Sequence, residues 1–220
     1  MSTDTPAPVK RRTSIGGRRN PQSATAILDA AADILAESGL AGFSIEAVAR
    51  RAGAGKPTVY RWWPTRTALL IEVYARQKET VLQVDTASLE GDLLAVMRRL
   101  FAFWRDTPAG PAFRSIIAEA QSDPQSLALL TTFLAERKQH VHALITRGIA
   151  RGELPSQADC ATVVELIFGF CWMRLLTGQI DRDADLPALV HHVLYGAGHS
   201  EGSEQKDGAT ALAAAPSRSA

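Results

Sequence analysis

The sequence lacks the features that mark several classes of protein. Its 220 residues include only two cysteines, Cys160 and Cys171, which are too few for a disulfide framework. If both lie on one helix, roughly 16 Å separates them, whereas a disulfide needs Cα atoms within about 7 Å of each other. We therefore expect a reduced, cytoplasmic protein.

Long apolar runs and leader segments are also missing. The most apolar stretch, residues 161–173, is interrupted by Glu165 and is shorter than the ~18 residues that a membrane span needs. The basic N-terminal region has no apolar core of the kind that signal peptides carry. We expect no membrane partner.

Motifs for catalysis, cofactors and metals are not found either. There is no nucleophile elbow, phosphate loop or catalytic carboxylate pair, and the glycines at 53 and 55 lack the spacing and the preceding strand of a dinucleotide loop. His140 and His142 are two residues apart on a predicted helix and point in different directions, so they cannot chelate one ion as a pair. We expect no catalytic residues, no cofactor and no metal.

Charge is distributed unevenly along the chain, although the net charge is only +1. Residues 1–66 hold ten Lys and Arg against five Asp and Glu, while the remainder holds 14 against 18. This +5 against −4 division favours a nucleic-acid partner at the N-terminal end alone.

Apolar residues recur with helical spacing through most of the chain, and no stretch alternates as a strand would. The pattern predicts an all-α fold of about nine helices, with 1–20 as a disordered basic arm and 200–220 as a disordered tail. We expect a three-helix domain over 21–66 and a larger helical domain over 67–199. The predicted helices are 21–39, 44–52, 56–63, 65–81, 88–106, 111–122, 124–151, 158–178 and 185–197.

The helix expected over 56–63 has two different faces. With Val59 set at 0° on the helical wheel, Trp63 falls at about 40° and Arg61 at about 200°. Val59 and Trp63 should therefore be core, whereas Trp62, at about 300°, lies at the edge of the open face. The open face carries side chains that suit phosphates and base edges. They are Lys56, Pro57, Thr58, Tyr60 and Arg61, with Trp62 at the margin.

The spacing of small residues predicts how this helix meets the one before it. Ala49 allows a close helix crossing, Gly53 permits a turn with positive φ, and Val59 fills the interface. This arrangement is typical of a helix-turn-helix, whose second helix enters the major groove of DNA.

The stretch FSIEAVARRAGAGKPTVYRWWPTRTALL resembles the N-terminal domain of the TetR family of transcriptional regulators over about residues 22–72. Two positions depart from the family pattern: Gly55 replaces the usual Ser cap, and Pro57 replaces a frequent Gly, which leaves the base preference open. The wheel and the resemblance together predict a set of DNA-binding residues: Ser44, Arg50, Lys56, Pro57, Thr58, Tyr60, Arg61, Trp62 and Arg66.

Some of the basic residues in this region are compatible with two different roles. Arg50 and Arg51 suit phosphate contacts or an ordinary solvated helix face. The basic pairs at 11–12 and 18–19 suit the minor groove of DNA or a solubilising arm.

The C-terminal part resembles one subfamily of these regulators through ARGELP at 150–155 and VVELIFGFCWMRLLTGQ at 163–179. In that subfamily the middle helices enclose a ligand pocket and the last two form a homodimer interface. Aromatic and apolar residues are candidates for the pocket, although for any one of them plain core is the favoured interpretation. The pocket candidates are Phe101, Trp104, Phe113, Ile117, Phe133 and Trp172.

The helix predicted over 158–178 is apolar on nearly every face. Such a helix must be buried all round, which its own domain cannot achieve alone, so we expect a homodimer. The candidate interface residues are Phe168, Leu175, Leu189 and Val193. Cys171, in the same helix, suits a redox sensor or a small core hydrophobe.

These expectations combine into a homodimeric regulator that binds a near-palindromic double-stranded DNA operator. We expect a repressor released by an unknown small-molecule effector of apolar or aromatic character. Two alternatives stay open, a ligand-binding enzyme with a DNA-binding head and a non-specific architectural DNA binder.

Overall fold

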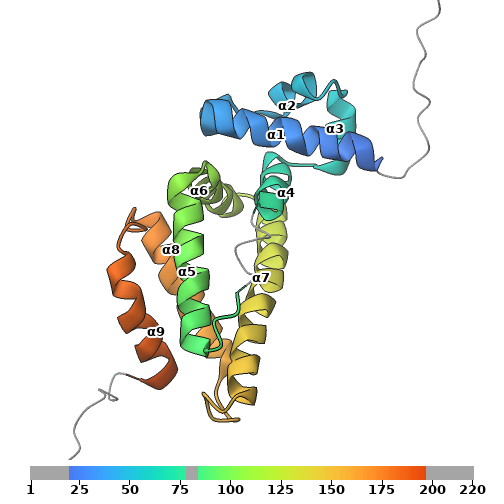
Figure 1. The fold of residues 1–220 in the computed structure, drawn as a ribbon. Coiled ribbons are helices and arrows are strands. Elements are labelled where there is room, and N and C mark those ends of the chain that lie inside the picture. The colour runs from blue at the N-terminus through green and yellow to red at the C-terminus, as the bar shows by residue number, and fades with distance from the viewer. Residues whose placement is uncertain (1–19, 78–83, 197–220) are drawn as a thin grey trace, which may run out of the picture.

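A computed structural model describes residues 20–77 and 84–196 of the chain (Figure 1). Helices make up all of its regular structure in this part of the chain, which confirms the predicted all-α class. The predicted basic arm and tail lie outside the described residues, apart from Asn20. So do the predicted helix ends at 81 and 197.

Three helices form the N-terminal unit, which we call the head: α1 (Pro21–Gly42), α2 (Ile45–Arg51) and α3 (Lys56–Trp62). The Asn20 side chain caps α1 by accepting the Gln22 N–H at 3.0 Å, and Pro21 follows in the first turn. Gly39 has a φ of +59°, which interrupts the regular helix at the predicted position, and one further turn continues to Gly42.

The turn between α2 and α3 has the predicted helix-turn-helix form. Ala49 is 2% exposed where the two helices cross, and Val59 is fully buried beneath α3. Gly53 has a φ of +60°, and the next amide, Ala54 N–H, donates to the Ala49 carbonyl at 2.9 Å. A residue with a Cβ at position 53 would be strained in this conformation.

The remaining helices form a second unit, which we call the body. Polar side chains cap several of its helices: Ser88 caps α5, Asp123 caps α7 and Asp159 caps α8. The body helices are α4 (Arg66–Gln77), α5 (Leu89–Asp106), α6 (Ala109–Ala120), α7 (Pro124–Ala150), α8 (Cys160–Leu176) and α9 (Leu186–Tyr195), with a 3₁₀ turn at Asp183–Asp185.

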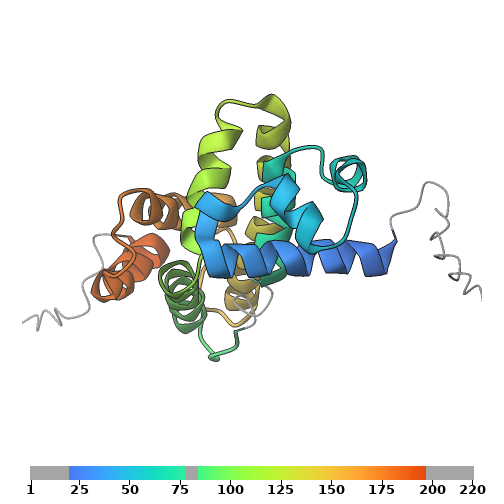
Figure 2. The same ribbon diagram turned by 90° about the horizontal axis from the view of Figure 1, so that it is seen from above.

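Helix α6 begins two residues earlier than predicted. Its third residue, Pro111, lies in the first turn, where backbone N–H groups have no partner within the helix, so proline is tolerated there. Helices α8 and α9 lie side by side on one flank of the body, away from the head (Figure 2).

Helix α4 joins the two units, packing against α1 of the head and against α6 and α7 of the body (Figure 1). Glu119 on α6 holds its first turn. One Glu119 oxygen is paired with Arg66, and the other accepts the Thr67 hydroxyl at 2.6 Å. The Arg66 guanidinium also lies over the Phe43 ring, 5.5 Å from its centroid. The start of α4 is therefore fastened to both units.

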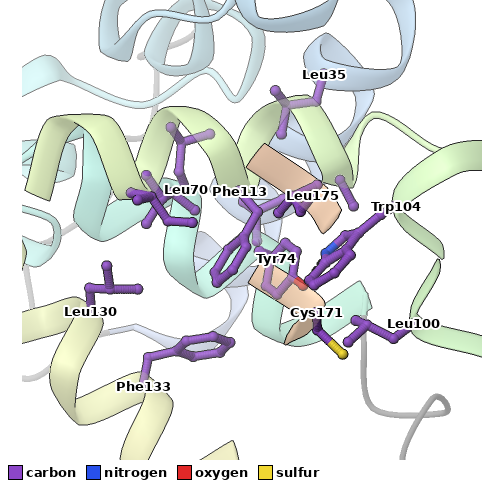
Figure 3. Packing of buried hydrophobic residues seen from close by; sticks show 14 of the residues in the cluster. Leu35, Leu70, Tyr74, Leu100, Trp104, Phe113, Leu130, Phe133, Cys171 and Leu175 are labelled. Carbon is purple, nitrogen blue, oxygen red and sulfur yellow. Dashed lines mark hydrogen bonds between the residues drawn. The ribbon is translucent and has the colours of Figure 1, made fainter. Parts of the chain in front are cut away.

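Aromatic rings dominate the body core near the other end of α4. Tyr74 stacks on Phe113 with ring centroids 4.7 Å apart, and Trp104 Nε1–H donates to the Tyr74 hydroxyl at 2.7 Å (Figure 3). Burial raises the pKa of Tyr74 far above its ordinary value, so the phenol stays neutral. The rings link α4 directly to α5 and α6.

Candidate DNA-binding face and ligand pocket

The outer side of α3 presents the side chains expected of a recognition helix. Lys56, Pro57, Tyr60 and Arg61 are exposed, and Tyr60 remains 45% accessible. Thr58 is half-buried at the edge of this face. Lys56 makes only an exposed ion pair with Glu46, at 3.2 Å, which solvent weakens. These groups face outward, and the two hydroxyls and two cations among them suit phosphates and guanine edges.

The adjacent tryptophans divide as the helical wheel predicts. Trp63 is 1% exposed in the head core, and its Nε1–H donates to Glu72 at 2.6 Å. Trp62 is half-buried at the margin of the open face, with the Arg61 guanidinium 5.8 Å from its ring centroid. Trp63 thus supports the fold, and Trp62 contributes to the outer surface.

The other predicted DNA-binding residues differ in what they contact. Arg50 is exposed at the end of α2, with no ion pair to any described residue, whereas the neighbouring Arg51 is held by Glu37 at 2.5 Å. Ser44 caps α2 by accepting the Ala47 N–H at 3.1 Å. Arg66 is committed to Glu119 on the body. Only Arg50 of these leaves its charge available on the outer surface.

A small apolar pocket lies in the body between α5, α6, α7 and α8. Its open space is about 30 Å³, roughly enough for one or two water molecules. Four of the six predicted residues line it, and several of them are visible in Figure 3. The full lining is Val96, Met97, Leu100, Trp104, Phe113, Phe133, Leu134, Arg137, Val141, Ile167, Phe168, Cys171 and Trp172.

Two pocket predictions are corrected. Phe101 is fully buried core, and it lies about 60° around α5 from Trp104, on the side away from the lining residue Leu100. Ile117 is also buried core and does not line the pocket. It lies in the second half of α6, close to Glu119, which contacts α4. Sequence reasoning also missed Arg137, although its spacing contained a signal. It stands between Phe133 and Val141 at intervals of four, a single cation on an apolar helix stripe.

The predicted dimer residues also need revision. Leu175 is fully buried within its own chain, so the expectation that it meets a partner is wrong. Phe168 lines the pocket, while Leu189 and Val193 are half-buried on α9. The apolar residues that α8 exposes are instead Leu166, Met173 and Leu176, at 51%, 52% and 52%. Periodicity could not tell these faces apart because every face of α8 is apolar.

Other kinds of site were sought in the same residues. Within 20–77 and 84–196, no group of three His, Cys, Asp or Glu side chains could hold a metal ion. Over those ranges, no helix is both long enough and apolar enough to cross a membrane. Cys160 and Cys171 are both free thiols on α8.

The helix-turn-helix head, the exposed recognition helix and the helical body define a DNA-binding regulator. Known families agree with this class: the bacterial regulatory proteins of the tetR family match residues 27–73, and the tetracyclin repressor-like C-terminal domain matches residues 83–193. The chain therefore belongs to the TetR family of transcriptional regulators, whose members bind DNA through this head and are not enzymes.

The similarity to individual relatives covers most of this chain and most of each relative. The HTH-type transcriptional regulator YdeS of Bacillus subtilis is 30% identical over 185 residues, covering 82% of this chain and 92% of YdeS. The solved structure of the TetR family regulator SCO0332 is 28% identical with a TM-score of 0.70, covering 80% of this chain and 98% of that one. FadR from Bacillus subtilis, solved in complex with stearoyl-CoA, shares the fold at 18% identity and a TM-score of 0.53, covering 78% of this chain and 98% of FadR.

Proposed function

We propose that this regulator is a homodimeric repressor that leaves a near-palindromic operator when a small apolar or aromatic molecule occupies the body pocket. The observation that carries the proposal is one continuous set of contacts. Trp104 and Phe113 line the pocket and also contact Tyr74 on α4, the helix that directly follows the head.

These contacts supply a physical route from ligand to DNA. A molecule that enters the small pocket must displace lining side chains, because protein interiors are closely packed. Trp104 and Phe113 cannot move without disturbing Tyr74 on α4. The first turn of α4 contacts the head through Arg66, whose guanidinium lies over the Phe43 ring. The ligand can shift the head only by its difference in affinity for the two arrangements.

The exposed stripe of α8 supports the homodimer. Leu166, Met173 and Leu176 lie on one side of the helix, and Gly169 between them has open space above its Cα. A two-fold pair of such surfaces is self-complementary and would hold two recognition helices at a fixed spacing.

DNA recognition is tested by selecting bound fragments from genomic DNA and titrating the enriched site against unrelated competitor at physiological salt. We expect an inverted repeat and a preference of about 10³-fold or more for the selected site. Equal affinity for random DNA would instead support an architectural binder.

Dimerisation is tested by light scattering on the variant with Leu166→Lys and Met173→Lys. We expect the wild type to be a dimer at micromolar concentration and this variant to be a monomer with weakened operator binding. The control is Leu127→Lys, because Leu127 is 45% exposed on α7. A monomeric wild type would refute the homodimer.

A further inference from the structure

The body pocket contains one charged group in an otherwise apolar wall. Twelve of its lining residues are apolar or aromatic, and the thirteenth is Arg137 on α7. The guanidinium lies over the Phe133 ring, 4.9 Å from its centroid, so the cation belongs to the pocket surface.

The exposure of the lining residues shows where the pocket opens. Nine of them are buried, and the four that are half-buried come from two helices only. Leu134 and Arg137 are one turn apart on α7, while Phe168 and Trp172 are one turn apart on α8. The mouth therefore lies between α7 and α8, with Arg137 on its rim.

Arg137 has an unused hydrogen-bond donor. Its Nε is buried, and no described residue accepts from it. The adjacent cation is different, because Lys138 is paired with Glu165 on α8 at 2.5 Å. The Nε of Arg174 is also buried without a partner, but its guanidinium is held by Asp185 at 2.6 Å, whereas no described carboxylate pairs with Arg137. A buried donor without a partner costs free energy, and a bound carboxylate would remove that cost.

We propose that the pocket takes a small organic acid with a single carboxylate and an apolar body, which deepens the proposed effector function and rests on it. The carboxylate binds Arg137 at the mouth, where Nε and a terminal nitrogen can donate side by side. The apolar body enters toward Trp104 and Phe113 and displaces flexible side chains such as Met97.

The test uses two acids and their neutral isosteres, because aromatic and aliphatic bodies would both suit this wall. Calorimetry measures binding of 2-naphthylacetate and decanoate, each beside its primary amide, to the full-length protein. We expect at least one acid to bind roughly 10- to 100-fold more tightly than its amide. The acid that binds identifies the type of body that the pocket prefers.

The variant Arg137→Met should abolish the preference for acid over amide and leave amide binding in place. The matched control is Lys138→Met, which removes the neighbouring cation and should retain the preference. Thermal melts establish that both variants fold. The proposal is overturned if neither acid binds at millimolar concentration, if acid and amide bind equally, or if Arg137→Met keeps the preference.

Operator release is measured separately, so that the two proposals can fail independently. An acid that binds through Arg137 but leaves the protein on its operator supports the ligand class and contradicts the effector function. An acid that binds and releases the operator supports both.

Discussion

The aromatic residues of the head divide between a filled core and an open surface, whereas those of the body surround a space that they do not fill. Trp63 is buried and its indole N–H donates to Glu72, while Tyr60 is exposed. Trp104, Phe113 and other rings instead face a cavity of about 30 Å³. A tightly packed core holds the outer face of α3 in one geometry. A core that contains a cavity can be rearranged by a ligand.

The largest expected effect tests the filled core of the head. Trp63→Ala should cost about 3–5 kcal/mol of unfolding free energy, because it removes a buried ring and its hydrogen bond to Glu72. Urea unfolding followed by circular dichroism measures the loss. Trp62→Ala serves as the control and should unfold close to wild type. If Trp63→Ala unfolds like wild type yet fails to bind DNA, the two tryptophans have been assigned the wrong way round.

The next effect concerns the junction between head and body. Glu119→Ala removes the partner of both Arg66 and Thr67, and we expect a loss of about 1–2 kcal/mol in unfolding free energy, since the site is only partly buried. Urea titration measures it, with exposed Glu136→Ala on α7 as the control. Equal stability of the two variants would show that the junction does not depend on Glu119.

The open face of the head is tested by Lys56→Ala and Tyr60→Ala. Each should weaken operator binding by about 1–3 kcal/mol if it loses a base contact, and leave stability nearly unchanged because both side chains are exposed. Fluorescence anisotropy titrations at fixed salt provide the measurement. Unaltered affinity in both variants would contradict the assignment of α3 as the recognition helix.

The smallest expected effect is a pH dependence of stability that arises from Glu153 in the body. Glu153 accepts the Leu89 N–H at 2.5 Å, and this bond together with Arg151 lowers the pKa of Glu153 below its usual 4.5. The folded protein favours the charged carboxylate, so ionised Glu153 stabilises the fold. This stabilisation is complete above pH 4.5 and is lost as pH falls toward the lower pKa that Glu153 has in the folded state.

This sign leads to a comparison of urea midpoints. The difference in urea midpoint between wild type and Glu153→Gln should stay constant from about pH 7 to 5.5. It should narrow below pH 4.5, where the wild-type carboxylate gains a proton. A difference that widens in acid would reverse the inferred direction of the pKa shift.

The sequence by itself determined the all-α class, the helix-turn-helix and the inward face of α3. These depend on local spacing: Ala49, Gly53 and Val59 lie within eleven residues, and a helix of known period places Trp63 inside and Arg61 outside. Helix caps are local in the same way, since Asn20 and Ser44 each accept a backbone N–H two or three residues further along the chain.

Only the tertiary structure decided which residues of the body meet. The family resemblance placed Arg66 among the DNA-contacting residues, yet it pairs with Glu119, 53 residues further along the chain. Leu175 and Met173 are both apolar on α8, but one is fully buried and the other is 52% exposed. Arg137 reaches a pocket lined from four helices. Period and composition describe one helix at a time, whereas a pocket or an interface depends on which helices pack against it.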